Sequence, residues 1–272
     1  MTEQVYYSQG FKKSISDTHA WRTVANSSKY VLDVLKPHFK VLDAGCGPGS
    51  ITIDFAENYL PQGSIIGIEP TQELIDTANA NKEKLNKPLD NLEFVKGSIY
   101  QLPFEDNTFD LVHVQQVIIH LQDPISALKE LRRVVKPQGF VCVRDADISS
   151  FLTYPEEYSL LGEHYALKAK NAVSTDIYAG RKLRSKALKA GYEPEKIKTS
   201  VSNWIFTDSM ESKNLWASTT IARLESGGEK FYPDDDAKDK ELRDKVIQLW
   251  KKWSKDETSL VNLPNYEIIY QK

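Results

Sequence analysis

The 272-residue sequence lacks most features of secreted, membrane or nucleic-acid-binding proteins. Its two cysteines, Cys46 and Cys142, are too few for a disulfide framework, and we expect both to be packing residues. A formal net charge of −3 argues against the basic surface that nucleic-acid binding requires. No apolar run approaches the ~20 residues of a membrane span, and no signal-peptide pattern follows Met1. We therefore expect a cytoplasmic protein with no membrane span and no nucleic-acid partner.

A glycine-rich turn is the most informative stretch of the chain. Residues 41–50 read VLDAGCGPGS, between an apolar run and a helix-like pattern. Alternate glycines let the backbone approach a ligand closely, and the N–H groups that open the helix point into the same space. A dinucleotide fingerprint would need a third glycine at Ser50, so a nicotinamide-dependent dehydrogenase is disfavoured.

Apolar strand patterns alternate with helical patterns from residue 39 to residue 145. Expected strands cover 39–44, 64–69, 92–95, 111–114 and 140–145. The helix after Asp123 has a capping residue and Pro124 in its first turn, and should stop at 136–139. Such alternation predicts an α/β fold with a doubly wound, mainly parallel sheet, whose ligands bind at the carboxyl ends of the strands. Glu69 ends the second strand, where a carboxylate can accept both hydroxyls of a ribose.

Two motifs resemble those of a known enzyme family. The pattern Asp43-x-Gly45-x-Gly47 resembles motif I of the class I S-adenosylmethionine-dependent methyltransferases, and LPFEDNTFD at 102–110 resembles their ubiquinone/menaquinone C-methylating group. The resemblance implies S-adenosylmethionine as cofactor. It also implies a Rossmann-like sheet of seven strands with the last, at 266–270, inserted antiparallel.

The resemblance also suggests roles for single residues. In that family the strand-end acid, here Asp43, organises the turn, and Gly45 and Gly47 lie under the methionine part of the cofactor. Ser98 stands where the family usually has an aspartate that binds the adenine amino group. The expected cofactor-binding set is Arg22, Thr23, Asp43, Gly45, Gly47, Glu69, Pro70, Ser98, Ile99 and Gln115. Within it, Arg22 is either a partner for the cofactor carboxylate or a solvated surface charge.

Three regions follow from these patterns. We expect a leader at 1–37 with a helix over 17–35, a cofactor-binding core at 38–147, and a remainder at 148–272. The remainder should hold a helix at 180–190, a strand at 197–206 and two aromatic-rich helical insertions, 148–175 and 209–257. By topology these insertions should cap the site, with the leader around Trp21 closing the opposite wall.

Methyl transfer from a sulfonium requires alignment of the acceptor more than a catalytic side chain. His120, beyond the fourth strand, and Asp145, at the end of the fifth, are the candidate bases. Either could instead be structural: His120 could fix the loop before Asp123, and Asp145 could pair with Arg144. His113 lies within a strand and is expected to be packed, and no metal is expected.

We therefore expect transfer of a methyl group to a small, apolar or aromatic molecule. A macromolecular acceptor is disfavoured because residues 114–117 read VQQV, not the Asn/Asp-Pro-Pro-aromatic motif of amide- and base-amino-methylating enzymes. A non-catalytic cofactor-binding module stays open as an alternative. The sequence leaves undecided whether oxygen, nitrogen or carbon is methylated, and in which oligomeric state the protein works.

Overall fold

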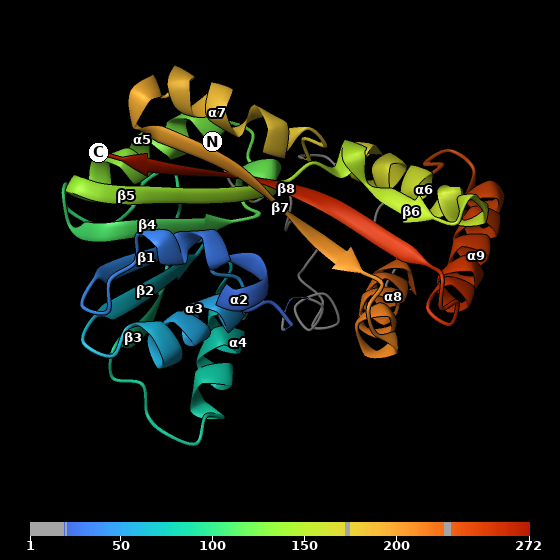
Figure 1. Ribbon diagram of the computed structural model, residues 1–272, viewed down its shortest axis with the longest axis horizontal. Helices are drawn as coiled ribbons and strands as arrows, with labels where there is room; N and C mark the ends of the chain where they lie inside the picture. Colours follow the sequence, from blue (N-terminus) through green and yellow to red (C-terminus); the bar gives the residue numbers. More distant parts are fainter. Residues whose placement is uncertain (1–18, 20, 172–174, 226–229) are drawn as a thin grey trace.

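The computed structural model describes residues 19, 21–171, 175–225 and 230–272 (Figure 1). These residues build one eight-stranded sheet in the order β3-β2-β1-β4-β5-β8-β6, with β7 also paired to β8. The strands are β1 Lys40–Ala44, β2 Ser64–Glu69, β3 Leu92–Lys96, β4 Phe109–Gln115, β5 Val135–Ala146, β6 Leu152–Tyr154, β7 Ile197–Phe206 and β8 Leu260–Gln271. The first five strands are parallel, whereas β8 runs antiparallel to β5, β6 and β7. The predicted doubly wound α/β class is confirmed.

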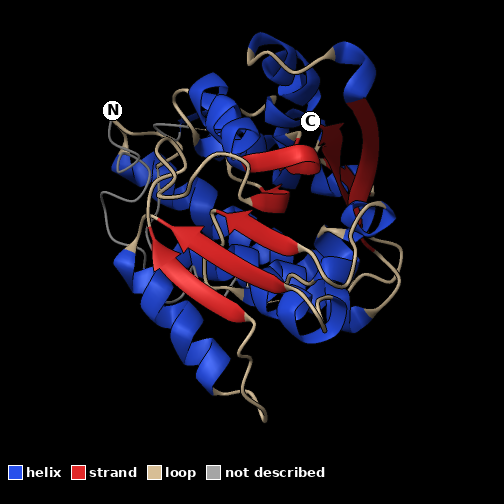
Figure 2. Cartoon of the chain, turned by 90° about the vertical axis from the view of Figure 1, so that its left-hand side faces the viewer, coloured by secondary structure: helices blue, strands red, loops and turns tan. Residues whose placement is uncertain are grey.

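Helices cover both faces of this sheet (Figure 2). They are α2 Val24–Ser27, α3 Ser50–Asp54, α4 Gln72–Glu83, α5 Pro124–Val134, α6 Ser159–Asn171, α7 Ala179–Lys189, α8 Met210–Glu225 and α9 Asp236–Trp253. Apolar residues of α5 and α7 pack into one core cluster, and those of α3 and α4 pack into a second. A third cluster joins α6, α8 and α9 to the far ends of β7 and β8. The described part of the chain thus has a doubly wound half and a helical cap, connected by continuous strands.

Helix α5 shows how local sequence sets an element's start and face. The Asp123 carboxylate accepts the backbone N–H of Ser126 at 3.0 Å, and Pro124 fills the first helical position. Leucines 128 and 131 then recur on the buried face. The helix ends at Val134, and residues 136–139, predicted to end it, already belong to β5.

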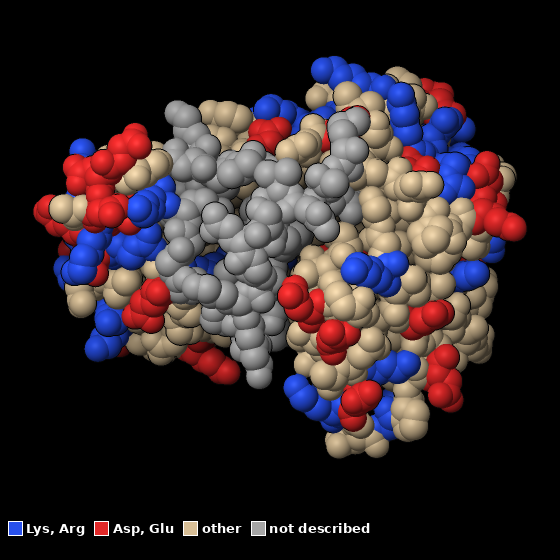
Figure 3. All heavy atoms as spheres, turned by 180° about the vertical axis from the view of Figure 1, so that it is seen from behind, with Lys and Arg blue, Asp and Glu red and all other residues tan. Residues whose placement is uncertain are grey.

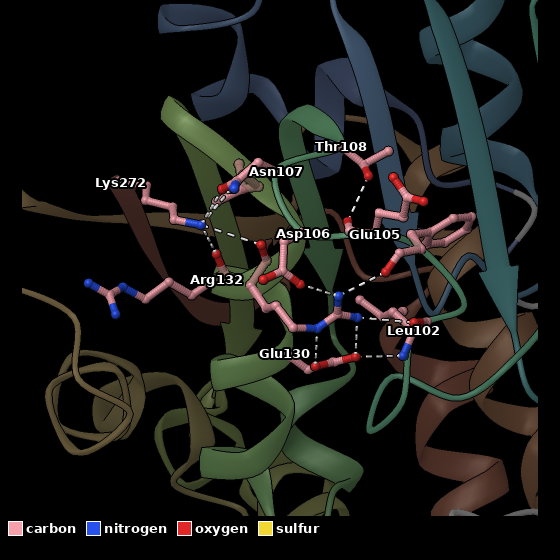
Figure 4. Close-up of polar contacts among 11 residues, drawn as sticks. Leu102, Glu105, Asp106, Asn107, Thr108, Glu130, Arg132 and Lys272 are labelled. Atoms are coloured by element: carbon pink, nitrogen blue, oxygen red, sulfur yellow. Dashed lines mark hydrogen bonds and ion pairs between the residues drawn. The ribbon is translucent and has the colours of Figure 1, made fainter.

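Residues 102–108 of the LPFEDNTFD motif form the loop before β4, and the motif's last two residues begin that strand. Arg133 of α5 holds the loop in place (Figure 4). The Arg133 guanidinium donates to the carbonyls of Leu102 and Phe104 at 3.1 and 2.8 Å, and to the Asp106 carboxylate at 2.7 Å. Glu130, one turn earlier, accepts from the same guanidinium at 2.6 Å. The LPFEDNTFD motif therefore has a structural role, because the carbonyl groups of Leu102 and Phe104 anchor the loop to α5.

Several predicted boundaries are wrong. The leader is not one helix over 17–35: within the described residues it forms α2 and then a 3-10 helix, Lys29–Asp33. Thr23 and Asn26 form a reciprocal capping box that starts a new helix at Val24. The first 18 residues of the predicted leader lie outside the described residues.

The terminal strand is also longer than predicted, and this changes the strand number. Strand β8 begins at Leu260 instead of Tyr266. Residues 261, 263 and 265 are buried and their neighbours are less so, which is the alternation of a strand that extends into the cap. Its first part pairs with β6, which occupies residues predicted to be helical, so the sheet has eight strands instead of seven. The second predicted cap insertion contains α8 and α9, which are separated by residues 226–229, outside the described ranges, and by a non-helical turn at 230–235.

Charge is spread over the surface without a dominant sign. On the face seen in Figure 3, acidic and basic side chains of the described residues are intermixed over both halves of the molecule. Within the described ranges, no helix is both long and apolar enough to cross a bilayer.

Candidate functional site

The glycine turn has the backbone conformation that its sequence predicts. Gly45, Gly47 and Gly49 all have positive φ, at 83°, 54° and 82°. A Cβ on Gly45 would lie 2.4 Å from Val117 Cγ2, and one on Gly49 would lie 2.6 Å from Phe94 Cζ. A Cβ on Gly47 would meet nothing within 4 Å. Gly45 and Gly49 therefore permit close internal packing, whereas Gly47 faces open space at the end of β1.

A buried polar network underlies this turn. Asp43, 3% exposed, accepts Thr52 Oγ1 on Oδ2 at 2.6 Å, and its Oδ1 lies 2.7 Å from His113 Nδ1. The other ring nitrogen of His113 is 2.8 Å from Ser28 Oγ. The network joins β1, β4, α3 and the leader at one point. Asp43 thus supports the glycine turn indirectly, by accepting the hydrogen bond of Thr52 in α3, the helix that follows the turn. His113, expected only to be packed, is the residue that connects these elements.

Glu69 lies directly beside the turn, as its position in the sequence predicts. Strand β2 runs parallel to β1 with Ile68 opposite Ala44. The buried Glu69 carboxylate accepts the backbone N–H of Gly47 on one oxygen and that of Thr71 on the other, both at 3.3 Å. Pro70 follows at the strand end and is half-buried. The parallel pairing of β1 and β2 therefore explains why Glu69 lies beside the glycine turn. A role for Glu69 and Pro70 in cofactor binding stays a prediction.

The remaining strand-end residues are more internal than the sequence suggested. Ser98 Oγ accepts the Tyr100 N–H at 3.1 Å, and Ile99 is 4% exposed within the core. Gln115 is 6% exposed; with its amide oriented so that both atoms have partners, its nitrogen donates to the Ser27 carbonyl at 3.1 Å and its oxygen accepts from Arg144 Nη1 at 2.8 Å. In the structure these three side chains support the sheet end, so their expected contacts with adenine or cofactor stay predictions.

Gln116, which the sequence did not single out, connects the end of β4 to the leader and to β8. It has a positive φ of 52°, which turns its side chain away from the regular strand direction. Its amide oxygen accepts from Arg22 at 3.1 Å and its amide nitrogen donates to Asn265 at 3.0 Å. Arg22 also lies over the Trp204 ring, 5.1 Å from its centroid. Thr23, the neighbour of Arg22, serves as the cap of α2.

Two imidazoles and two guanidinium groups lie close to one another in this region. His19 belongs to the leader, and its carbonyl accepts Ser50 Oγ at 3.3 Å, immediately beyond the glycine turn. Burial, then Arg22 and Arg223, lower the pKa of His120 to about 3, and the same causes lower the pKa of His19. Both imidazoles are therefore neutral at pH 7. A pKa so far below neutrality makes His120 a weak general base.

Asp145, the second candidate base, supports the backbone near His120. It is fully buried, which raises its pKa to about 7. One carboxylate oxygen accepts the Ile119 N–H at 3.4 Å, and the other has no partner among the described residues. Arg144 bonds Ser202 at 3.0 Å and lies 3.4 Å from Glu267, so the expected Arg144–Asp145 pair is replaced by a pair across β5 and β8.

An aromatic wall completes the candidate site. Trp21 of the leader packs against Trp204 and Phe206 of β7, with ring centroids 5.0 and 5.8 Å apart. Trp216 of α8 stacks on Phe206 at 4.5 Å. Trp21 therefore contacts the cap itself instead of closing an opposite wall. Trp250 and Trp253 are fully buried in the cap core, so they serve to hold α9 on the sheet.

Comparison with known proteins gives a consistent picture. Residues 35–214 match a family described as a methyltransferase domain. An uncharacterized methyltransferase of Schizosaccharomyces pombe is 43% identical over 283 residues, covering 100% of this chain and 98% of that protein. A demethylmenaquinone methyltransferase of Bacillus cereus is 33% identical over 141 residues, covering 52% of this chain and 57% of that one.

Solved structures show the same fold at low sequence identity. A phosphoethanolamine N-methyltransferase 2 of Haemonchus contortus, in complex with S-adenosylhomocysteine, has a TM-score of 0.57 at 15% identity, over 100% of this chain and 61% of that one. A [4+2]-cyclase has a TM-score of 0.52 at 17% identity, over 94% and 79% of the two chains. These likenesses concern the fold alone, because one architecture carries different reactions.

Proposed function

This chain belongs to the methyltransferase domain family and is an S-adenosylmethionine-dependent methyltransferase, and we propose that it methylates a small, largely apolar molecule bearing an ionisable hydroxyl. The observation that carries the proposal is that three features lie together at one edge of the sheet. They are the glycine turn, the aromatic wall, and the group formed by His19, Arg22, His120 and Arg223. Ser50 links the turn to His19, Gln116 links β4 to Arg22, and Arg22 lies on Trp204.

The turn and Glu69 fit the expected cofactor. Open space beside Gly47 admits a ligand against the backbone. Each oxygen of the Glu69 carboxylate accepts a backbone N–H at 3.3 Å, and such oxygens take more than one hydrogen bond, so ribose hydroxyls suit this position. When bound, the cofactor supplies an activated methyl group. The proposed binding residues are Arg22, Thr23, Asp43, Gly45, Gly47, Glu69, Pro70, Ser98, Ile99 and Gln115, with Asp43 acting through the turn.

The charge around His120 favours an acceptor that loses a proton easily. Arg22 and Arg223 oppose protonation of the two imidazoles. By the same Coulomb interaction they would lower the pKa of a phenol-like or enol-like hydroxyl and disfavour an ammonium. Transfer to that oxygen, or to a carbon conjugated with it, then needs no strong base. In this proposal His120 orients the acceptor, and Asp145 holds the backbone of residues 118–120.

The aromatic wall supports an acceptor with a flat or apolar body. Trp21, Trp204, Phe206 and Trp216 pack against one another close to Arg22. Trp204, Phe206 and Trp216 are only 4–6% exposed, so in this proposal the acceptor meets the edge of this apolar cluster. A polymeric acceptor would need an extended polar or charged groove instead. A macromolecular substrate is therefore the alternative that the experiment must test.

The experiment uses methyl-labelled cofactor and acceptors that share one skeleton. Naphthols, naphthohydroquinones and naphthylamines are offered separately, together with total protein and total RNA as macromolecular substrates. Label should enter the hydroxyl-bearing compounds, and the rate should rise with pH as the hydroxyl ionises. Arg223→Gln should move that rise to higher pH without abolishing the binding of S-adenosylhomocysteine. Label in naphthylamines alone, or in protein or RNA alone, would overturn the proposal.

A further inference from the structure

Strand β7 is an unusually exposed sheet edge. Within the described part of the chain it pairs with β8 alone, along all ten of its residues. Val201 and Ile205 are 52% and 51% exposed, and the strand contains no proline. Monomeric proteins normally protect such an edge with charges, proline or a bulge, because its free N–H and C=O groups can pair with another strand. From Thr199 to Phe206 β7 carries no charged residue.

The exposed apolar surface continues across the neighbouring strands. Ile205 lies opposite Asn262 of β8, and Asn262 lies opposite Leu152 of β6. Residues directly opposite one another point to the same side of a sheet. Leu152 and Tyr154, which are 51% and 58% exposed, therefore share a face with Ile205. In Figure 1 β7 runs beside β8 from the core toward the cap.

We propose that β7 pairs antiparallel with β7 of a second copy, about a twofold axis at Asn203. In that arrangement Val201 of each copy lies opposite Ile205 of the other copy, so the interface contains two Val201–Ile205 pairs. Lys198 faces Asp208, which is exposed just beyond the strand. Both matches are repeated by the symmetry, as an isologous interface requires. The two eight-stranded sheets then form one continuous sheet.

A twofold axis at either neighbouring residue, Ser202 or Trp204, would lose both the Val201–Ile205 pairs and the Lys198–Asp208 pairs. An axis at Ser202 places Val201 against Asn203 and Lys198 against Phe206. An axis at Trp204 places Val201 against Thr207 and Lys198 against Met210. Asn203 is therefore the centre that combines apolar cover with opposite charge. The apolar pairs supply the affinity, whereas the exposed charges mainly fix the register. Lys198 lies 3.0 Å from Asp33 of its own copy, so Asp208 of the partner would share or replace that ion pair.

The proposed interface also bears on the candidate site. Trp204 and Phe206 alternate with Val201 and Ile205 along the same strand and form the aromatic wall on its other face. Pairing of two β7 strands would hold this wall in place in both copies. The inference concerns assembly and is independent of which acceptor is methylated.

Sedimentation velocity gives the first test. At concentrations between about 1 and 100 µM, the range in which weak dimers form, the wild type should change from 30.9 kDa toward twice that mass. Val201→Lys and Ile205→Lys should stay monomeric with an unchanged circular dichroism spectrum, since both side chains are exposed. Thr199→Lys, outside the proposed apolar pair, is the matched control and should still dimerise, somewhat more weakly.

Cysteine cross-linking tests the register. Asn203→Cys places two thiols directly opposite each other, within the Cα separation of about 4.4–6.8 Å that a disulfide needs. Thr199→Cys lies eight residues from its own copy, roughly 26 Å away, and is the control. The native Cys46 and Cys142 are buried and free. A disulfide-linked dimer for Asn203→Cys and not for Thr199→Cys is expected. A monomeric wild type at every concentration, or a dimer in which Asn203→Cys fails to cross-link, would overturn the proposal.

Discussion

Replacing His113 by phenylalanine tests the polar network beneath the glycine turn. The ring is fully buried and connects Asp43, at 2.7 Å, with Ser28, at 2.8 Å. Phenylalanine fills a similar volume and can keep the edge contact with Phe55, whose ring centroid is 5.2 Å away. The substitution therefore removes the two polar contacts and leaves most of the packing.

The expected loss of stability is large because both partners are left buried. A buried hydroxyl without its partner costs about 1–3 kcal/mol. Losing a buried hydrogen bond to a carboxylate costs roughly 1.5–3 kcal/mol. Thr52 still donates to Asp43 at 2.6 Å and offsets part of this. We expect the free energy of unfolding to fall by about 3 kcal/mol, which lowers Tm by roughly 6–12 °C in a protein of this size.

Urea unfolding followed by circular dichroism measures this loss, and calorimetric titration with S-adenosylhomocysteine measures the effect on the turn. Ser28→Ala is the matched control, because it removes the hydroxyl and leaves the His113–Asp43 contact; it should cost about 1 kcal/mol. In the double variant Thr52→Val with His113→Phe the losses should not add, because both residues bond Asp43. A loss below ~1 kcal/mol for His113→Phe, with unchanged affinity for S-adenosylhomocysteine, would refute this reasoning.

Three further predictions concern the turn and the end of β5. Glu69→Ala should weaken S-adenosylhomocysteine binding by roughly 2–4 kcal/mol in a folded protein, whereas unchanged affinity by calorimetry would remove Glu69 from the site. Gly47→Val should abolish that binding because its side chain enters the open space, while Cys46→Ser, a conservative change in the same turn, should bind normally; wild-type binding by the valine variant would place the ligand elsewhere. Burial raises the pKa of Asp145 to about 7, so the folded state binds a proton that the unfolded state releases near pH 4, and stability falls as pH rises between these values. Asp145→Asn should therefore be more stable than the wild type at pH 8, by about 4 kcal/mol at most, with the gain vanishing below about pH 4; a gain independent of pH would exclude this origin.

Local sequence patterns were enough to predict the core of the fold. The glycine turn, the alternating strands and the capped start of α5 depend on residues within a few positions of one another, as at Asp123 and Ser126. Parallel strands then bring their carboxyl ends together, which is why Glu69 could be placed beside Gly47 from spacing alone.

Contacts between distant segments could not be predicted in the same way. The burial of His113 follows from its position within a strand, but its contact with Asp43 could not be predicted because the two residues lie 70 positions apart. The contact of Gln116 with Arg22 could not be predicted either, because the positive φ of Gln116 has no signal in the amino-acid type. Strand β6 could not be predicted because three residues are too few to show a strand period, and they form a strand only by pairing with β8.

The length of β7 and β8 limits how this enzyme can open. Both strands run without interruption from the doubly wound half into the cap, and they are paired at ten successive positions. A hinge between the two halves would have to break this ladder, so the cap cannot swing like a lid on a flexible linker. Amide hydrogens in the middle of β8, between β7 and β5, should consequently exchange only on global unfolding. If the acceptor binds at the proposed site, its entry and the release of the product depend on rotation of side chains and on short backbone shifts and not on movement of the whole cap.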